Sequence, residues 1–287
     1  MHKSFLKFIA IGIFLMGLLC LSFDYQTVYA AIEWNIQKTI ALDDIPLDVA
    51  YSLYGGKAYV LCKKSLLIYD LETGTITDKI PLETEFSKIT VTPNQDLVYL
   101  TDVAGKKISV LSISNVYTID IGQSPIIGAN DAKVNMVAFL DFQCPYCAQV
   151  YPTIQEVLKK YPKEVNLIIK HYPLTSIHKA AESAALASLA AARQKKYKEF
   201  NDLLFKNYRN LNDETINNYA KEAGLDMVAF EKDIKDPELK KMITEDMNQG
   251  QKLGVRGVPS VYINGKPIKG GRSLDSFVAT IDKELKK

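Results

Sequence analysis

The sequence lacks the charge and hydrophobic patterns that mark nucleic-acid-binding and membrane-spanning proteins. Its 287 residues carry 35 Lys and Arg against 33 Asp and Glu, with a formal net charge of +2 and no basic stripe. Proteins that bind nucleic acid usually concentrate positive charge on one face, so we expect no nucleic-acid partner. The apolar run at residues 8–21 has 14 residues, whereas a helix that crosses a bilayer needs about 20.

Cysteine and histidine are also scarce, with four and three residues in the chain. Only Cys144 and Cys147 form a CxxC pair, and the nearest histidine along the chain is His171. A zinc site needs about four ligands, often including a second CxxC or a pair of histidines. We therefore expect neither a metal ion nor another cofactor. A metal-handling protein stays open as an alternative reading of the CxxC pair.

The first 30 residues have the pattern of a secretory signal peptide. A basic start precedes the apolar run, and Val28-Tyr29-Ala30 fits a cleavage site. Cys20 follows Leu18-Leu19 rather than the small residues of a lipoprotein site. The pattern predicts export to an extracytoplasmic space, such as a periplasm or cell envelope, with an uncleaved anchor as the alternative. A disulfide can form and persist in such a compartment.

The segment Cys144-Pro145-Tyr146-Cys147 lies between a predicted buried strand, residues 137–140, and a predicted helix, residues 148–160. A helix start offers unpaired N–H groups and the positive end of the dipole, which favour a thiolate. We expect a lowered pKa for Cys144, which attacks, while Cys147 resolves the mixed disulfide. Pro145 suits a first helical turn, and Tyr146 should affect redox poise and substrate contact. A structural disulfide across so short a loop would stabilise little.

Two stretches resemble the DsbA-like thioredoxin-fold family: Asp141-Phe142-Gln143-Cys144-Pro145-Tyr146-Cys147 and Leu253-Gly254-Val255-Arg256-Gly257-Val258-Pro259-Ser260-Val261-Tyr262-Ile263-Asn264-Gly265. The resemblance covers about residues 130–287. It implies an α/β thioredoxin fold with a helical subdomain inserted at about residues 175–252. It also implies that Pro259 is cis beside the cysteine pair, and that the backbone of Val258 pairs with a substrate peptide.

The sequence departs from the family pattern at one position. Thioredoxin-fold enzymes often carry a buried acid six residues before the attacking cysteine, where this chain has Ala138. Asp141 is the nearby acid, and how Cys147 loses its proton stays open. His171 either faces the active site and tunes the thiolate or caps a turn, and His178 lies at a predicted helix start with the same two readings.

Residues 39–122 contain an internal repeat of about 40 residues. Ala58-Tyr59-Val60 aligns with Val98-Tyr99-Leu100, Leu67-Ile68-Tyr69 with Ser109-Val110-Leu111, and Thr77-Asp78-Lys79-Ile80 with Thr118-Ile119-Asp120-Ile121. Four short strands per copy are typical of a propeller blade. Because two blades are too few to close a propeller, we expect the pair to pack on the thioredoxin domain, to contact a second chain, or to form a small sandwich. Cys62 is predicted to lie in its core, with an intermolecular disulfide as the alternative.

These patterns divide the chain into a signal peptide (1–30), an all-β domain of two propeller-blade-like repeats (31–124) and a DsbA-like domain (125–287). The predicted function is that of an exported thiol–disulfide oxidoreductase, with the oxidase or isomerase direction open. The expected partners are reduced or misoxidised exported proteins, a membrane redox partner and a second copy bound through residues 31–124. The alternative is an exported scaffold whose repeats bind a partner and whose thiols are inert.

Overall fold

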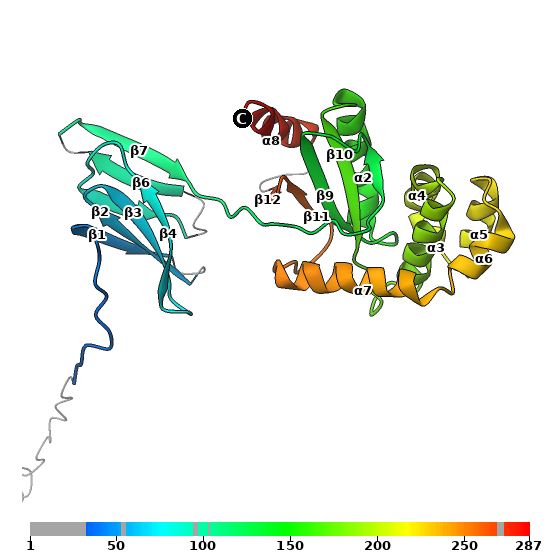
Figure 1. Cartoon of the computed structure of the whole chain (residues 1–287), viewed down its shortest axis with the longest axis horizontal. Coiled ribbons are helices and arrows are strands. Elements are labelled where there is room, and N and C mark those ends of the chain that lie inside the picture. The colour runs from blue at the N-terminus through cyan, green and yellow to red at the C-terminus, as the bar shows by residue number, and fades with distance from the viewer. Residues whose placement is uncertain (1–32, 53–55, 94–96, 103, 269–272) are drawn as a thin grey trace, which may run out of the picture.

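The computed structural model describes residues 33–52, 56–93, 97–102, 104–268 and 273–287. The predicted signal peptide, residues 1–30, lies outside the described residues. Within them, no helix has both the length and the apolar character needed to cross a bilayer. Two bodies joined by an extended segment make up the described chain, a β module and a larger α/β domain (Figure 1).

The α/β domain is built on a five-stranded sheet with the order β12-β11-β9-β10-β8. Strands β9 and β10 run parallel at its centre, and the other pairings are antiparallel. The bounds of the strands are β8 Ile126–Gly128, β9 Val134–Leu140, β10 Val165–His171, β11 Ser260–Ile263 and β12 Lys266–Pro267. Helix α2 (Pro145–Lys160) connects the two central strands, as a parallel pair requires a crossover.

A set of helices lies between β10 and β11, where the resemblance implied an inserted subdomain. They are α3 Ala181–Arg193, α4 Tyr197–Lys206, the short 3₁₀ helix η1 Tyr208–Asn210, α5 Asp213–Glu222, α6 Met227–Asp233 and α7 Pro237–Lys252. Polar side chains cap several of these starts: Asn212 and Thr215 form a capping box on α5, and Asp226 and Asp236 cap α6 and α7. The last helix, α8 (Leu274–Leu285), begins after Ser273, whose side chain accepts a hydrogen bond from the N–H of Ser276.

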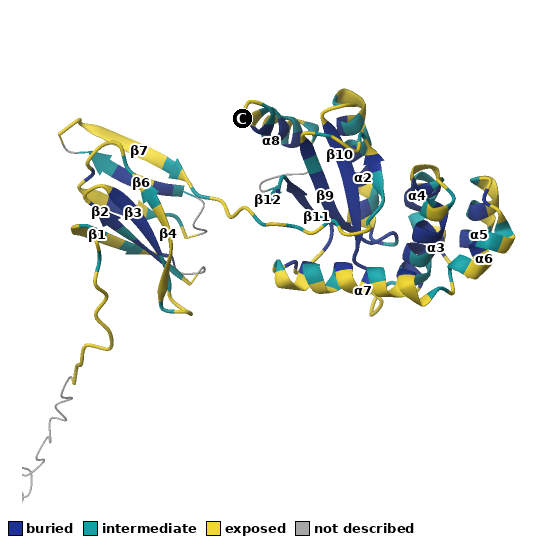
Figure 2. Ribbon diagram, viewed as in Figure 1, coloured by how far each residue is buried: buried dark blue, intermediate teal, exposed yellow. Residues whose placement is uncertain are grey.

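Both central strands of this sheet are buried, as Figure 2 shows. Every residue of β10 and all but one of β9 are buried. Helices α2 and α8 contact one another, and α7 contacts β10. A buried ion pair joins these layers, because Lys170 Nζ lies 2.9 Å from Asp246 Oδ1. Asp246 Oδ2 also accepts a hydrogen bond from the N–H of His171.

The hairpin between β11 and β12 turns at Asn264-Gly265. Both residues have positive φ, 45° and 76°, as a two-residue type I′ turn requires. A Cβ at Gly265 would overlap the backbone carbonyl of Tyr117. Glycine is therefore required here for the turn and also for the close approach of the preceding segment.

The β module consists of two antiparallel sheets. The first has the order β1-β2-β3-β4, with bounds β1 Pro46–Tyr51, β2 Lys57–Cys62, β3 Ser65–Asp70 and β4 Thr75–Pro81. The second has the order β5-β6-β7, with bounds β5 Lys88–Val91, β6 Leu97–Asp102 and β7 Lys107–Ser112. The sheets share one core, which contains Tyr59, Leu61, Leu66, Ile68, Phe86, Ile89, Val98 and Leu100. Cys62 is buried, as predicted.

The propeller expectation needs correction in the second sheet. The first sheet has the four strands of a blade, but the described part of the second has three. Thr118-Ile119-Asp120-Ile121, predicted as its fourth strand, forms no strand. Instead, Ile119 and Ile121 pack against the core of the α/β domain. The described module is thus a pair of small open sheets packed on one another.

The same segment attaches the β module to the α/β domain. The N–H of Tyr117 donates to Gly265 O at 2.8 Å, and its ring meets Tyr262 edge-on at 6.0 Å between centroids. The side chains of Gln249 and Lys170 donate to the carbonyls of Asp120 and Ile121. These contacts bury the apolar side chains of the segment on the α/β domain and so compete with strand formation.

Candidate functional site

The CxxC segment lies at the junction of β9 and α2, as the sequence predicts. Cys144 is the N-cap of α2 with extended backbone (φ −73°, ψ 121°), and Pro145 occupies the first turn. Cys147, one turn further, is fully buried, whereas the Tyr146 side chain is exposed. Cys144 is the more accessible of the two thiols, although most of its surface is covered. Both are free thiols in this structure.

The two thiols have opposite acidities. The pKa of Cys144 is lowered from 9.0 to about 6. The largest cause is a hydrogen bond from the Cys147 thiol, and the backbone N–H groups of Cys147 and Tyr146 add to it against the effect of burial. Burial raises the pKa of Cys147, and its interaction with Cys144 raises it more. At neutral pH Cys144 is therefore mainly a thiolate, the nucleophilic form of the side chain.

The loop before β11 lies directly against Cys144. Its Sγ is 3.7 Å from the carbonyl oxygen of Val258, although 114 residues separate the two along the chain. The Val258–Pro259 peptide bond is cis, as the resemblance implied. The fold thus brings together the four residues of the CxxC segment with Val258 and Pro259.

Asp141 is a buried carboxylate beside the cysteines. It accepts hydrogen bonds from the backbone N–H groups of Gln143 and Leu174, and its Oδ2 lies 2.8 Å from His178 Nδ1. The negative charge of Asp141 raises the pKa of both Cys144 and Cys147, and in each thiol this effect is smaller than that of burial. The sequence indicated Asp141 as the nearby acid, but it gave no sign that His178 is its partner.

His171 lies in the core rather than beside the thiols. It is buried at the end of β10, its ring is 5.7 Å from that of Phe142, and its Nε2 is 3.3 Å from the Tyr197 hydroxyl. Burial lowers its pKa to about 3, so it is neutral at physiological pH. Of the two readings for His171, the structure favours a structural one.

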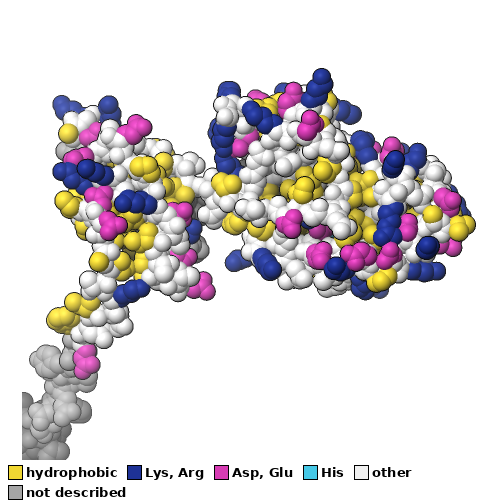
Figure 3. All heavy atoms as spheres, viewed as in Figure 1, with side chains coloured by type: hydrophobic (Ala, Val, Ile, Leu, Met, Phe, Trp, Pro, Cys, Tyr) yellow, Lys and Arg dark blue, Asp and Glu magenta, His cyan; other side chains and the backbone are white. Residues whose placement is uncertain are grey.

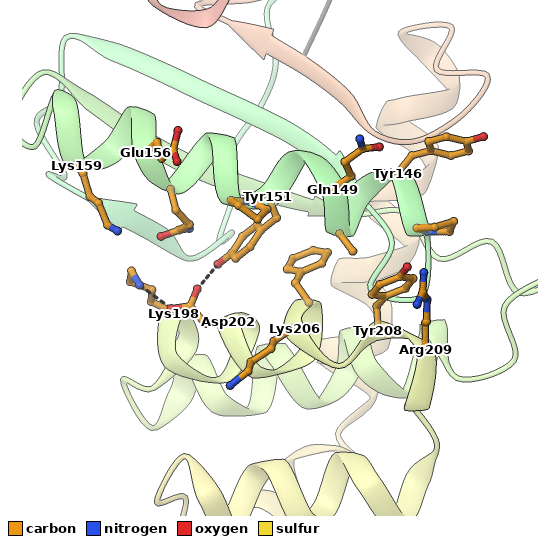
Figure 4. Close-up of a pocket in the computed structure, with 15 residues that line it drawn as sticks. Tyr146, Gln149, Tyr151, Glu156, Lys159, Lys198, Asp202, Lys206, Tyr208 and Arg209 are labelled. Carbon is orange, nitrogen blue, oxygen red and sulfur yellow. Dashed lines mark hydrogen bonds and ion pairs between the residues drawn. The ribbon is translucent and has the colours of Figure 1, made fainter. Parts of the chain in front are cut away.

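A groove of about 800 Å³ begins at the CxxC segment and runs between α2 and α4 (Figure 4). Pro145, Tyr146 and Gln149 line it near the thiols, and Lys159, Lys198, Lys206 and Arg209 lie along it. Tyr151 donates to Asp202 at 2.9 Å across the groove, and Lys198 pairs with the same carboxylate. Sequence reasoning missed this groove, because its walls come from two helices, α2 and α4, that are not adjacent in the chain.

No group of three or more His, Cys, Asp or Glu side chains in the described ranges is arranged to hold a metal ion.

Comparison with known proteins agrees with this geometry. The sequence model of a family described as Thioredoxin matches residues 120–283, more than half of the chain. The chain belongs to the thioredoxin family. Its structural relatives include a thioredoxin-like oxidoreductase and a thiol–disulfide exchange protein, and its fold is like theirs.

Three solved structures illustrate the likeness. A thioredoxin-like oxidoreductase from Silicibacter pomeroyi DSS-3 is 28% identical with a TM-score of 0.52, over 57% of this chain and 93% of that one. A periplasmic thioredoxin-like protein from Salmonella enterica serovar Typhimurium is 28% identical with a TM-score of 0.51, over 57% and 91%. The thiol–disulfide exchange protein α-DsbA2 from Wolbachia pipientis is 25% identical with a TM-score of 0.52, over 56% and 86%.

Curated relatives of the thioredoxin-family chain are longer proteins. The Na⁺/H⁺ antiporter NhaA 3 of Salinispora tropica is 31% identical over 163 residues, which are 57% of this chain and 25% of the relative. The NhaA 1 protein of Salinispora arenicola is 29% identical over the same shares. The chain thus spans about a quarter of the length of these curated relatives.

Proposed function

We propose that this protein is an exported thiol–disulfide oxidoreductase that exchanges disulfides with protein substrates through Cys144 and Cys147. The observation that supports this best is the pairing of opposite acidities at one helix start. Cys144 has a pKa of about 6 and lies against Val258, whereas Cys147 is fully buried with a raised pKa. This pairing suits one attacking thiol and one resolving thiol.

The proposed reaction moves two electrons between a substrate dithiol and the cysteine pair. In the oxidising direction, a substrate thiolate attacks Sγ of Cys144 in the Cys144–Cys147 disulfide. The S–S bond breaks, and Cys147 leaves and takes up a proton. A second substrate thiolate then attacks the substrate sulfur of the mixed disulfide, so Cys144 leaves as a thiolate and the substrate keeps the new disulfide.

The lowered pKa of Cys144 favours disulfide donation over disulfide reduction. A stabilised thiolate stabilises the reduced protein and makes the disulfide form a stronger oxidant. An oxidase then needs a membrane redox partner that accepts the two electrons and restores the disulfide. An isomerase would instead be kept reduced by such a partner.

Substrate contact is assigned to the backbone of Val258 beside Pro259, and to Tyr146 at the mouth of the groove. Tyr146 is exposed next to the thiols, as a contact residue should be. The substrates are then reduced or misoxidised exported proteins. An extracytoplasmic location is supported by the periplasmic relative from Salmonella and by the signal pattern at residues 1–30.

The domain assignment retains the three proposed units: a signal peptide at 1–30, the β-repeat unit at 31–124 and the DsbA-like unit at 125–287. The blade-like sheets are proposed to bind a second copy, and the faces concerned are derived below. A non-enzymatic scaffold is the competing proposal, and it requires both thiols to be inert.

The test is the equilibrium reduction potential of the Cys144–Cys147 pair against glutathione, combined with trapping of substrates. Cys147→Ser should accumulate mixed disulfides with a misoxidised protein substrate. The Cys144 thiolate attacks a substrate disulfide, one substrate sulfur leaves as a thiolate, and no Cys147 thiol is present to resolve the bond. Cys144→Ser is the matched control and should trap none.

A potential above that of the glutathione couple supports the oxidase direction, and a lower one supports a reductase or isomerase. If the pair does not equilibrate with glutathione and neither variant traps a substrate, the enzyme proposal is wrong and the scaffold takes its place.

A further inference from the structure

The two sheets of the β module are related by the repeat, but they pack together through faces that are not equivalent in the two repeats. Alignment of the two repeats pairs Tyr59 with Tyr99 and Ile68 with Val110. Tyr59 and Ile68 are 1% and 4% exposed in the shared core, whereas Tyr99 and Val110 are 37% and 54% exposed on the outer face of the second sheet. Equivalent residues thus lie on the inner face of one sheet and on the outer face of the other.

The converse also holds: residues on the inner face of the second sheet are equivalent to residues on the outer face of the first. Val49 aligns with Ile89 and Val60 with Leu100. Ile89 and Leu100 are buried in the shared core at 6% and 2%, but Val49 is 56% exposed on the outer face of the first sheet. Strand register places Val60 and Leu67 on that same face, because Val49 pairs with Val60 and Val60 with Leu67. The sheets are therefore stacked front to back, like successive units of a repeat array.

Front-to-back stacking leaves one outer face uncovered on each sheet. Each of these outer faces is equivalent to the inner face of the other sheet. The outer face of the first sheet, here called the A face, carries Val49, Tyr51, Val60, Tyr69 and Ile76, together with the buried side chains of Ala58 and Leu67. The outer face of the second sheet, here called the B face, carries Thr90, Tyr99, Thr101, Ile108 and Val110. Figure 3 shows hydrophobic side chains exposed on the module. Clustered exposed apolar residues of this kind mark interaction surfaces.

We propose that the B face of one chain binds the A face of a second copy of the same chain. The partner is fixed by the repeat itself. The inner face of the second sheet, which already receives the first sheet, is equivalent to the A face. The inner face of the first sheet is equivalent to the B face. The intermolecular contact therefore repeats the packing inside the module, and it is heterologous.

Because every chain offers one A face and one B face, such a contact forms a ring where the rotation between successive chains closes, and an open filament where it does not. Two chains supply four sheets, the lower end of the usual range of four to eight blades in a propeller. The ring would complete between copies what one chain lacks. This inference rests on the β module and does not depend on the proposed thiol chemistry.

The test is the solution mass of the purified protein by sedimentation equilibrium, with one charged substitution on each face. Val49→Asp removes the A face and Val110→Asp removes the B face. Val228→Asp is the matched control, because Val228 is an exposed valine on α6 of the thioredoxin domain. We expect the wild type and Val228→Asp to have the mass of two or more chains, and each face variant to have the mass of one.

Mixing the two face variants provides the most specific test of the proposed contact. Val49→Asp retains a B face and Val110→Asp retains an A face, so the mixture should form a one-to-one heterodimer. A monomeric wild type would overturn the proposal. If Val110→Asp alone keeps the wild-type mass, the contact joins two A faces instead; if Val49→Asp alone keeps it, two B faces.

A second pair of variants, Tyr51→Lys on the A face and Ile108→Lys on the B face, distinguishes loss of association from loss of folding. Both positions are exposed, so neither substitution disturbs the shared core. Restored association in the mixture can come only from folded modules. If neither pair restores it, a head-to-tail contact is ruled out.

Discussion

The thioredoxin domain and the β module bury their sheets to very different degrees. All seven residues of β10 are buried, whereas in β7 five of six are exposed and one is half-buried. Helices and the inserted subdomain cover the central sheet of the thioredoxin domain, but each sheet of the module has one covered face. The thioredoxin domain, whose central sheet is covered on both faces, can hold a reactive group in a fixed position. The β module, whose sheets are each covered on one face, presents its other faces to a second molecule.

The thiols of the two regions differ in acidity. Cys144 is stabilised as a thiolate at a helix start, with its pKa lowered to about 6. Cys62 lies in the module, where burial raises its pKa. Burial is the largest effect on the Cys62 thiol and outweighs Ser65 and Lys79, which favour the anion, so we assign the chemistry to one region only.

The largest expected effect separates these thiols directly. Cys144→Ser should reduce the rate of disulfide exchange on the order of a thousandfold or more, as removal of an attacking nucleophile does in other enzymes. Cys62→Ser should leave the rate unchanged. Turnover of a reduced or scrambled protein substrate measures both, and equal loss in the two variants would contradict the division of roles.

Core substitutions test whether the two regions unfold independently. Phe139→Ala in β9 should cost about 3–5 kcal/mol and Leu61→Ala in β2 about 2–5 kcal/mol, because each leaves a cavity in its own core. Calorimetry should show one transition shifted by each variant and the other unmoved. A single transition shifted by both would show that the two cores unfold as one unit.

The acidity of Cys144 predicts a pH dependence confined to the thioredoxin domain. The rate of alkylation of the reduced protein should have its midpoint near pH 6 and be about tenfold lower at pH 5 than on the alkaline plateau, following the thiolate fraction. Mass spectrometry of the alkylated peptides should place the label on Cys144. A midpoint near 9, or label on Cys147, would refute the acidity argument.

The same shift links the stability of the reduced protein to pH. The pKa of Cys144 is lower in the folded protein than its ordinary value of 9.0. Its contribution to stability is therefore fully present above pH 9.0 and declines as the pH falls from 9.0 to about 6. Denaturant titrations of wild type and Cys144→Ser across this window should converge at its acidic end.

The smallest effect is expected at a helix cap. Asp226 accepts hydrogen bonds from the N–H groups of Val228 and Ala229 at the start of α6. Asp226→Ala should lower the free energy of unfolding of the thioredoxin domain by about 1 kcal/mol. Glu231→Ala, at an exposed position of the same helix, is the control, and the transition of the β module should move in neither variant.

Local patterns predicted the strand and the helix on either side of the CxxC segment. Asn212, Ser273 and the Asn264-Gly265 turn act where propensity alone places them, because caps and tight turns depend on neighbouring residues. The fourth strand expected at Thr118-Ile119-Asp120-Ile121 failed for the opposite reason. Its alternating pattern suits either a sheet edge or an extended segment packed on another surface, and only the complete fold selects between them.

The sequence by itself determined the CxxC segment at a strand-to-helix junction, because the hydrophobic period and Pro145 fix that junction locally. The tertiary structure decided what surrounds it: Val258 against Cys144, His178 beside Asp141, and the groove between α2 and α4. It also decided that the two repeats stack front to back and leave unlike faces open. These relations join residues far apart in the chain, and their energies depend on burial that no local pattern specifies.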